Sequence, residues 1–267
     1  IVFGDWSSDV CSSDLQIPFI NSFVLGVPYF KTKSLEKPEM NTDSIRKKNV
    51  VRILHAPSHP AAKGTFRIRE VMEKLSAKGY KIEFIQLQGR PNHEVLQELQ
   101  NCDFVVDQVY SDSPMTGFAT EAACYGKPSV VGGYGFDYLK KFIPKDIFPP
   151  SQICLPHNLE KAIEELIVNP HLREQLGREA QLFIHSQWHA EKVAQRYIQL
   201  IEKKIPDDWW LSPEQIVYIH GAGQPEEQTK KNIQTMIKMY GIKSLQLSDR
   251  PDLEKAFWEF AEIRSNE

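Results

Sequence analysis

The carboxylate of Glu121 lies one turn into a predicted helix that begins at Thr116-Gly117-Phe118. The start of a helix offers unpaired backbone N–H groups and the positive end of the helix dipole to a phosphate. Gly117 leaves room for a ligand to approach, and the Glu121 carboxylate can accept hydrogen bonds from two ribose hydroxyls. This short stretch therefore predicts one element that holds both the sugar and the phosphate of a nucleotide ligand.

A second phosphate-binding feature lies upstream, where a predicted strand over residues 50–54 runs into the loop 55–65. This loop places Lys63 beside Gly64 at the start of the next helix, where a lysine ammonium can neutralise a diphosphate. His55, next to the end of the strand, is expected to contact the phosphate or sugar of the same ligand. Lys63 and the helix start at 116–118 can together stabilise the charge that grows on a departing diphosphate. We therefore predict that Lys63 is the catalytic residue and that no metal is needed.

Two motifs, taken in order, resemble those of a known enzyme family. Lys63-Gly64 resembles the phosphate lysine loop of GT-B glycosyltransferases of the group 1 type (family 4), and the stretch from Gly117-Phe118 through Glu121-Ala122 to Gly126-Lys127-Pro128 resembles their Gly-Phe…Glu-Ala…Gly-x-Pro signature. The resemblance covers residues 50–201 and concerns the nucleotide-sugar-binding half of those enzymes.

The resemblance implies a reaction and a set of ligands. A sugar would pass, with retention of anomeric configuration, from a UDP- or GDP-linked donor to an unknown glycan, lipid or small-molecule acceptor. Gly89 and Arg90, which follow the second predicted strand, would wrap the nucleobase. The nucleotide-sugar is the substrate, no cofactor is expected, and the sequence contains no Asp-x-Asp motif to bind a metal.

Two other functions stay open at this point. A nucleotide-sugar epimerase can use the same fold, because fold does not settle the reaction. A non-catalytic nucleotide-sugar-binding or regulatory subunit is the second alternative, since Ser113 and Pro60 stand where the family often has a glutamate and an arginine.

The composition of the 267-residue chain argues against several classes of protein. Hydrophobic residues make up 41% and charged residues 25%, and the net charge of −3 provides no basic field for nucleic acid. The apolar stretch 17–27 is too short to cross a bilayer and is expected to be a linker or remnant strand. The four cysteines show no CxxC spacing, which favours reduced thiols. We expect a protein of the cytoplasm or of the inner face of the membrane.

Short apolar runs alternate regularly with amphipathic stretches from residue 49 to residue 204. The pattern predicts strands at 50–54, 81–87, 128–131 and 152–155, a further strand with its centre at 104–106, and helices at 65–78, 91–100, 116–126, 158–168, 170–186 and 190–203. Such alternation indicates an α/β fold, a doubly wound parallel sheet whose ligands bind at the carboxyl ends of the strands. Gly132 to Gly135 are expected to form a flexible turn that lines the cleft.

The two ends of the chain are predicted to lie outside this donor-binding domain. Residues 1–15 repeat Ser-Ser-Asp and resemble translated sequencing-adapter DNA, so we expect a fragment that lacks the acceptor domain. Residues 16–48 would be a linker or the remnant of that domain. Residues 205–267 would be a mainly helical extension, with a strand-like run at 216–219, helices at 225–240 and 251–263, and a short run at 244–247.

Overall fold

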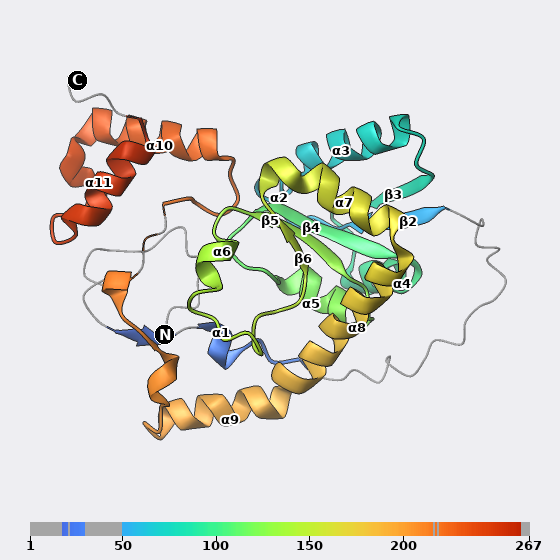
Figure 1. Ribbon diagram of the computed structural model, residues 1–267, viewed down its shortest axis with the longest axis horizontal. Helices are drawn as coiled ribbons and strands as arrows, with labels where there is room; N and C mark the ends of the chain where they lie inside the picture. The colour runs from blue at the N-terminus through green and yellow to red at the C-terminus, as the bar shows by residue number, and fades with distance from the viewer. Residues whose placement is uncertain (1–17, 21, 30–49, 216, 218, 263–267) are drawn as a thin grey trace.

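A five-stranded parallel sheet forms the centre of the protein (Figure 1). The computed structural model describes residues 18–20, 22–29, 50–215, 217 and 219–262. The strands lie in the order β3-β2-β4-β5-β6, and every neighbouring pair is parallel. Their bounds are β2 Val51–His55, β3 Ile82–Gln86, β4 Phe104–Ser111, β5 Ser129–Gly133 and β6 Gln152–Cys154. The predicted fold class is therefore confirmed, and all five strands lie where the sequence pattern placed them.

Helices cover both faces of this sheet because successive strand residues point to opposite sides. α3 (Thr65–Ala77) and α7 (Leu159–Val168) pack on the face that carries Ile53 and Phe104. α4 (Asn92–Asn101) and α5 (Gly117–Cys124) pack on the other face, against Leu54 and Val105. α8 (Pro170–Gln187) in turn packs on α5. Burial on both faces is most complete at β4 and β5 inside the sheet, whereas the edge strand β3 is only partly buried and carries the exposed Glu83.

The expectation of a flexible turn at 132–135 is wrong for its first two residues. Gly132 and Gly133 are buried residues of β5, and the short helix α6 (Phe136–Leu139) follows almost at once. A Cβ atom would lie 2.5 Å from the Val109 carbonyl oxygen at Gly132, and 2.1 Å from that of Ser111 at Gly133. These glycines are needed because β5 approaches the backbone of β4 closely, rather than for flexibility.

The segment 18–29, apart from residue 21, is part of the packed structure, so of the two expectations, a linker or a remnant strand, the linker does not fit here. β1 (Phe19–Ile20) pairs antiparallel with β7 (Trp210–Leu211). α1 (Ser22–Leu25) buries three apolar side chains in a cluster that also contains Ile143 and Ile147, beside α9 (Ala190–Ile201). The predicted adapter-like residues 1–15 and the polar stretch 31–48 lie outside the described residues.

The C-terminal region forms a helical unit of its own. α10 (Glu226–Tyr240) and α11 (Pro251–Phe260) are joined through the 3-10 turn η6 (Ile242–Leu245), and a small apolar cluster around Leu247 and Leu253 packs this connection against α11. Nε2 of Gln234 in α10 donates to the Ala261 carbonyl oxygen, just after α11, at 2.6 Å. The two predicted helices are confirmed, whereas the strand-like run at 216–219 falls partly outside the described residues. Further short 3-10 turns are η3 (Pro156–Asn158), η4 (Asp207–Trp209) and η5 (Pro213–Gln215).

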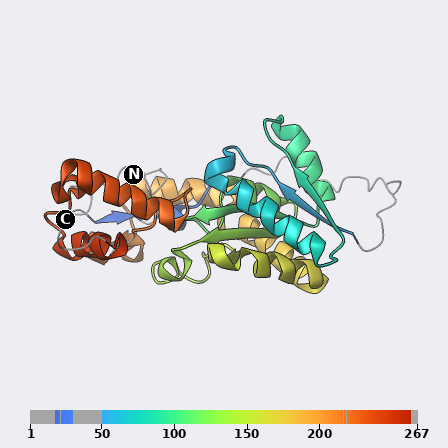
Figure 2. The ribbon, with the colours of Figure 1, turned by 90° about the horizontal axis from the view of Figure 1, so that it is seen from above.

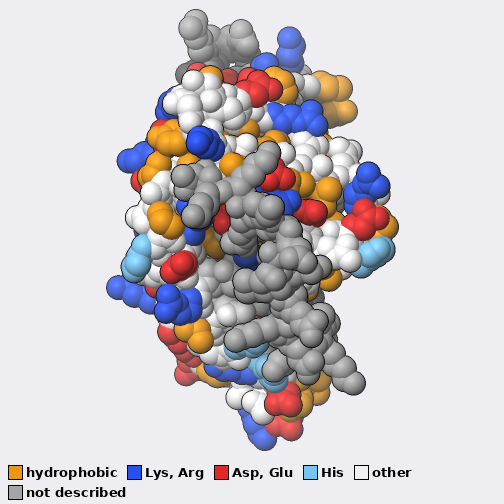
Figure 3. Space-filling model, turned by 90° about the vertical axis from the view of Figure 1, so that its right-hand side faces the viewer, with side chains coloured by type: hydrophobic (Ala, Val, Ile, Leu, Met, Phe, Trp, Pro, Cys, Tyr) orange, Lys and Arg blue, Asp and Glu red, His pale blue; other side chains and the backbone are white. Residues whose placement is uncertain are grey.

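α10 and α11 lie at one end of the molecule, beyond the carboxyl ends of the strands (Figure 2). On the face that Figure 3 shows, acidic and basic side chains are interspersed with hydrophobic ones instead of gathering into a patch of one sign. Within the described ranges, no helix has the length and apolar character that a membrane crossing requires.

Candidate functional site

The order of the strands places a topological switch point at the carboxyl ends of β2 and β4. The chain passes from β2 to β3 on one side of β2, and β4 then pairs with β2 on the other side. Ligands of open parallel sheets bind at such a switch point. Both predicted phosphate-binding elements begin here, because Lys63 follows β2 and the start of α5 follows β4.

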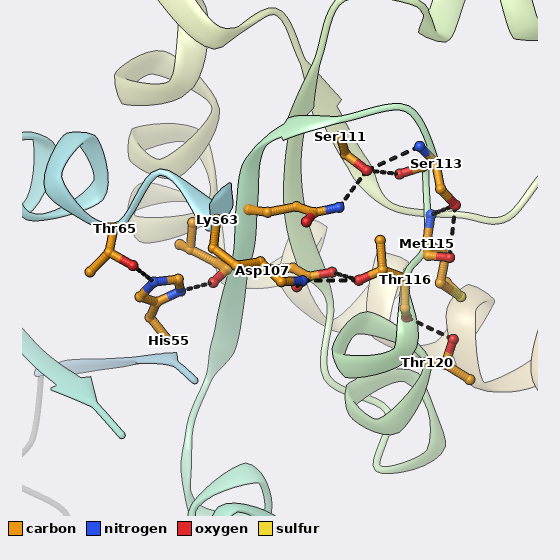
Figure 4. A network of polar contacts seen from close by, with 11 residues as sticks. His55, Lys63, Thr65, Asp107, Ser111, Ser113, Met115, Thr116 and Thr120 are labelled. Carbon is orange, nitrogen blue, oxygen red and sulfur yellow. Dashed lines mark hydrogen bonds and ion pairs between the residues drawn. The ribbon is translucent and has the colours of Figure 1, made fainter. Parts of the chain in front are cut away.

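Lys63 ends the single-turn helix α2 (Pro60–Lys63), which the sequence pattern did not predict. Nδ1 of His59 accepts a hydrogen bond from the Ala62 N–H at 3.2 Å and so caps the start of this turn. Pro60 occupies its first position, where the missing N–H costs nothing. This turn aims the Lys63 side chain toward β4 (Figure 4).

Asp107 is the residue that Lys63 meets there, and sequence reasoning missed it. Lys63 Nζ lies 2.7 Å from Asp107 Oδ1, and the hydroxyl of Thr116 donates a hydrogen bond to Asp107 Oδ2 (Figure 4). The Asp107 side chain is 0% exposed and that of Lys63 is 16% exposed. A charged residue within the apolar run 104–109 was the only sequence signal for this pair.

The start of α5 has no side-chain cap. Thr116 is its N-cap residue, but the Thr116 hydroxyl is directed to Asp107 instead of to a backbone N–H. Gly117 is exposed, and a Cβ atom added there would meet nothing within 4 Å. The first N–H groups of α5 therefore face open space with the positive end of the helix dipole behind them.

The turn that leads into α5 is held by its own serines. Ser111 Oγ donates to the Ser113 carbonyl oxygen at 2.7 Å, and Ser113 Oγ donates to that of Met115 at 3.0 Å. Ser113, which stands where the resembled family often has a glutamate, thus shapes the approach to the helix.

Glu121 meets a second residue that sequence reasoning missed. Nδ2 of Asn92, the first residue of α4, donates to Glu121 Oε1 at 3.1 Å. Asn92 follows the loop of Gly89 and Arg90, so the structure brings the predicted nucleobase loop to the Glu121 side of the site. Gly89 is exposed with φ +66°, and Arg90 Nε lies 3.9 Å from Glu94 Oε2. The sequence signal that could have found Asn92 was a polar residue at the start of the helix that follows β3.

His55 lies under the site instead of in it, so a direct contact with a ligand does not fit this arrangement. Its side chain is completely buried, with Nδ1 2.8 Å from the Val106 carbonyl oxygen and Nε2 2.9 Å from Thr65 Oγ1 (Figure 4). Burial lowers the pKa of His55 to about 4, although the hydrogen bond to Val106 opposes this shift. His55 therefore stays neutral at pH 7 and joins β2, β4 and α3.

Gly64 also has a packing role in place of the expected ligand contact. It is buried with φ +71°, and its N–H donates to the Ala61 carbonyl oxygen at 3.1 Å. A Cβ atom there would lie 2.7 Å from Val109 Cβ and 3.1 Å from the Tyr110 ring. Glycine is required because the turn that carries Lys63 rests directly on β4.

A cavity of about 300 Å³ opens beside this site, between the ends of β5 and β6 and the helices α6 and α7. Gly133, Tyr134, Lys140 and Lys161 are among its lining residues, whereas Lys63, Thr116 and Glu121 are not. The switch point between β2 and β4 fits the chemistry of the motifs better, because Lys63, Thr116 and Glu121 lie there and do not line the cavity. Among the residues that the structure describes, no group of three or more His, Cys, Asp or Glu side chains could hold a metal ion.

Comparison with known proteins gives similarity to solved structures only. No family model matches the sequence, and no curated protein matches it significantly. TarM of S. aureus, solved as a mutant with fondaparinux, alpha-GlcNAc-glycerol and UDP, is 16% identical over 56% of this chain and 35% of TarM, with a TM-score of 0.43. HepE of Anabaena, solved with UDP-glucose, is 14% identical over 58% of this chain and 49% of HepE, with a TM-score of 0.40.

A third similar structure is a proposed UDP-N-acetylglucosamine 2-epimerase of Listeria monocytogenes. It is 13% identical over 59% of this chain and 46% of its own length, with a TM-score of 0.35. The match to this chain thus spans half or less of each of these three structures. At such low identity the likeness concerns the fold alone.

Proposed function

We propose that this chain binds a UDP- or GDP-linked sugar and takes part in its retaining transfer to a hydroxyl acceptor. The observation that carries the proposal is the convergence of Lys63, the uncapped start of α5 and Glu121 at the switch point between β2 and β4. Lys63 offers an N–H donor to a phosphate oxygen, the start of α5 offers the positive end of its dipole to the diphosphate, and Glu121 offers an acceptor to the hydroxyls of a ribose.

The diphosphate would lie between Lys63 and the first N–H groups of α5. Asp107 offsets the charge of Lys63, so the pair carries no net charge. It would therefore contribute to diphosphate binding through directed hydrogen bonds. An ammonium group has three N–H donors. Asp107 and, at 3.5 Å, Thr116 Oγ1 accept two of them, which leaves one for a phosphate oxygen. The positive end of the α5 dipole adds the attraction that the neutral pair lacks.

The ribose would lie on the other side, against Glu121 and Asn92. The carboxylate is already oriented by the Asn92 amide and can still accept hydrogen bonds from hydroxyl groups. The nucleobase would then reach the exposed loop at Gly89 and Arg90, which immediately precedes α4. Lys63 and the start of α5 would stabilise the leaving diphosphate in the transfer step.

Calorimetry with nucleotides tests this proposal directly. UDP, which the TarM and HepE structures contain, is the first ligand to test, followed by GDP and the two bare nucleosides. We expect one diphosphate to bind much more tightly than its nucleoside, because only the diphosphate engages Lys63 and α5. Failure of the folded protein to bind either diphosphate would contradict the proposal. Recovery of the donor sugar with a changed configuration would instead indicate an epimerase.

Glu121→Ala is expected to weaken binding of the preferred nucleoside diphosphate by about 1.5–3 kcal/mol, the range for a charge-assisted hydrogen bond. The bare nucleoside should lose as much, because Glu121 contacts the ribose that both ligands share. Calorimetry on both ligands measures the two losses.

The matched control is Glu174→Ala, which removes an exposed carboxylate of α8 away from the proposed ribose and nucleobase contacts. The affinity of this control variant for both ligands should stay close to that of the wild type. An unchanged affinity in Glu121→Ala, with the fold intact by circular dichroism, would exclude the ribose assignment.

A further inference from the structure

The C-terminal helices are connected to the candidate site by a short segment that we call the strap, residues 219–225. The Gly223 N–H donates to the Tyr110 carbonyl oxygen, near the end of β4, at 2.7 Å. The strap then enters α10, and the Glu226 N–H donates to the hydroxyl oxygen of Tyr134 at 3.0 Å. The strap is therefore tied to the ends of two neighbouring strands, β4 and β5, at the edge where ligands are expected.

Aromatic rings reinforce these two ties. The His220 ring stacks on Tyr134, with centroids 4.7 Å apart and an angle of 16° between the planes. Tyr134 in turn faces Tyr110 at 6.5 Å. Phe260 of α11 packs edge-on against the other side of His220, at 4.9 Å. The rings thus connect α11, through the strap, to β4.

The strap also touches the turn that carries Lys63. Gly223 lies so close to α2 that a Cβ atom added to it would be 3.1 Å from Ala62 Cβ. Ala62 precedes Lys63, and Gly64, which follows Lys63, rests on Val109 and Tyr110 of β4. The turn α2, which carries Lys63, therefore lies between β4 on one side and the strap on the other. Figure 1 shows the chain that enters α10 passing the carboxyl-end edge of the sheet beside α2.

We infer that the strap is a working part of the phosphate site: it sets the position of Lys63 relative to the start of α5, so that diphosphate binding requires the C-terminal helical unit. This inference rests on the proposed function, because it concerns how the same diphosphate is held. Gly223 and Ala62 act as positioning residues, since neither carries a group that could bind phosphate. The nucleoside end of the site is held by the hydrogen bond between Asn92 of α4 and Glu121 of α5, so we expect it not to depend on Gly223.

The test is Gly223→Ala, measured by calorimetry with the preferred nucleoside diphosphate and its bare nucleoside. The new methyl group must displace α2 by a few tenths of an ångström. We expect a loss of diphosphate affinity on the order of tenfold, less than the 10²-fold that a misplacement of about 1 Å can cost in rate. The affinity for the nucleoside should stay unchanged, which a general loss of structure would not produce.

Gly241→Ala is the matched control. Gly241 lies in the same helical unit and also has a positive φ, +76° against +74° at Gly223, but a Cβ atom there would meet nothing within 4 Å. Its diphosphate affinity should equal that of the wild type. The double variant Gly223→Ala/Ala62→Gly removes the colliding methyl group of α2 and should recover most of the lost affinity.

The outcomes separate this inference from the proposed function. A wild type that binds diphosphate, with Gly223→Ala binding it equally well, overturns the inference and leaves the proposed function standing. Equal losses in Gly223→Ala and Gly241→Ala, or a double variant without recovery, also overturn the inference. A wild type that binds no diphosphate overturns both. If Gly223→Ala does not fold, Tyr134→Phe is the second variant, because it removes only the hydroxyl that accepts the Glu226 N–H. We expect this variant to lose affinity for the diphosphate and to keep its affinity for the nucleoside.

Discussion

Lys63→Met is expected to destabilise the fold by about 3–5 kcal/mol, because it leaves Asp107 as a buried charge without its partner. The Asp107 side chain is completely buried, and the Thr116 hydroxyl would be the hydrogen-bond donor that still reaches it. Methionine keeps the length of the side chain, so the change removes charge and hydrogen bonds with little change in volume. Urea unfolding of the wild type and the variant measures the difference.

Two further variants decide whether the buried charge is the cause. Lys63→Met/Asp107→Asn removes both charges and should be much more stable than Lys63→Met alone. Lys78→Met removes a lysine whose carboxylate partners, Glu160 and Glu164, are partly exposed, and its effect should be much smaller. Equal losses in Lys63→Met and in the double variant would contradict the role of Asp107.

The double variant also separates binding from folding. With a stable fold and no ammonium group, it should bind the nucleoside normally and the diphosphate weakly, because only the diphosphate carries the charge that Lys63 contacts. Equal losses for the two ligands would show that Lys63 acts through the shape of the loop.

The free energy of unfolding is expected to fall by about 3 kcal/mol between pH 6.5 and pH 4 through His55 alone. Its pKa is lowered from 6.5 to about 4 in the folded protein by burial. Between these two values the unfolded chain binds a proton that the native protein does not, so lowering the pH favours unfolding. The contribution is fully present above pH 6.5 and is lost as the pH falls toward 4.

Urea unfolding at four pH values between 7 and 4 measures this slope, with His55→Gln as the control. Glutamine can still donate and accept hydrogen bonds but does not titrate, so the variant should be less sensitive to pH in this range even if it is less stable overall. Asp252, whose pKa is lowered to about 2 by its hydrogen bond to Arg250, acts at lower pH and does not interfere. Identical slopes in the two proteins would contradict the assignment to His55.

Local patterns in the sequence were sufficient for the five strands of the sheet, for the longer helices and for their order along the chain, but not for short elements such as α1, α2 and α6. A run of apolar residues bounded by polar turns predicts a strand wherever it lies, and the alternation with helices leads to a parallel sheet. Because all strands of such a sheet end at one edge, Lys63 and the start of α5 could be placed together before any contact was known. Glu121 could be assigned to the same region for the same reason, and its role in binding stays a prediction.

Contacts between residues far apart in the chain could be decided only by the tertiary structure. Whether His55 reaches a ligand depends on Val106 and Thr65, which bury it, and the charge at the site depends on Asp107, which neutralises Lys63. The packing of α1 and of the strap likewise depends on partners such as α9 and Ala62. The periodicity of a sequence reports local conformation, whereas the burial and partner of a polar side chain are set by whichever distant segment packs against it.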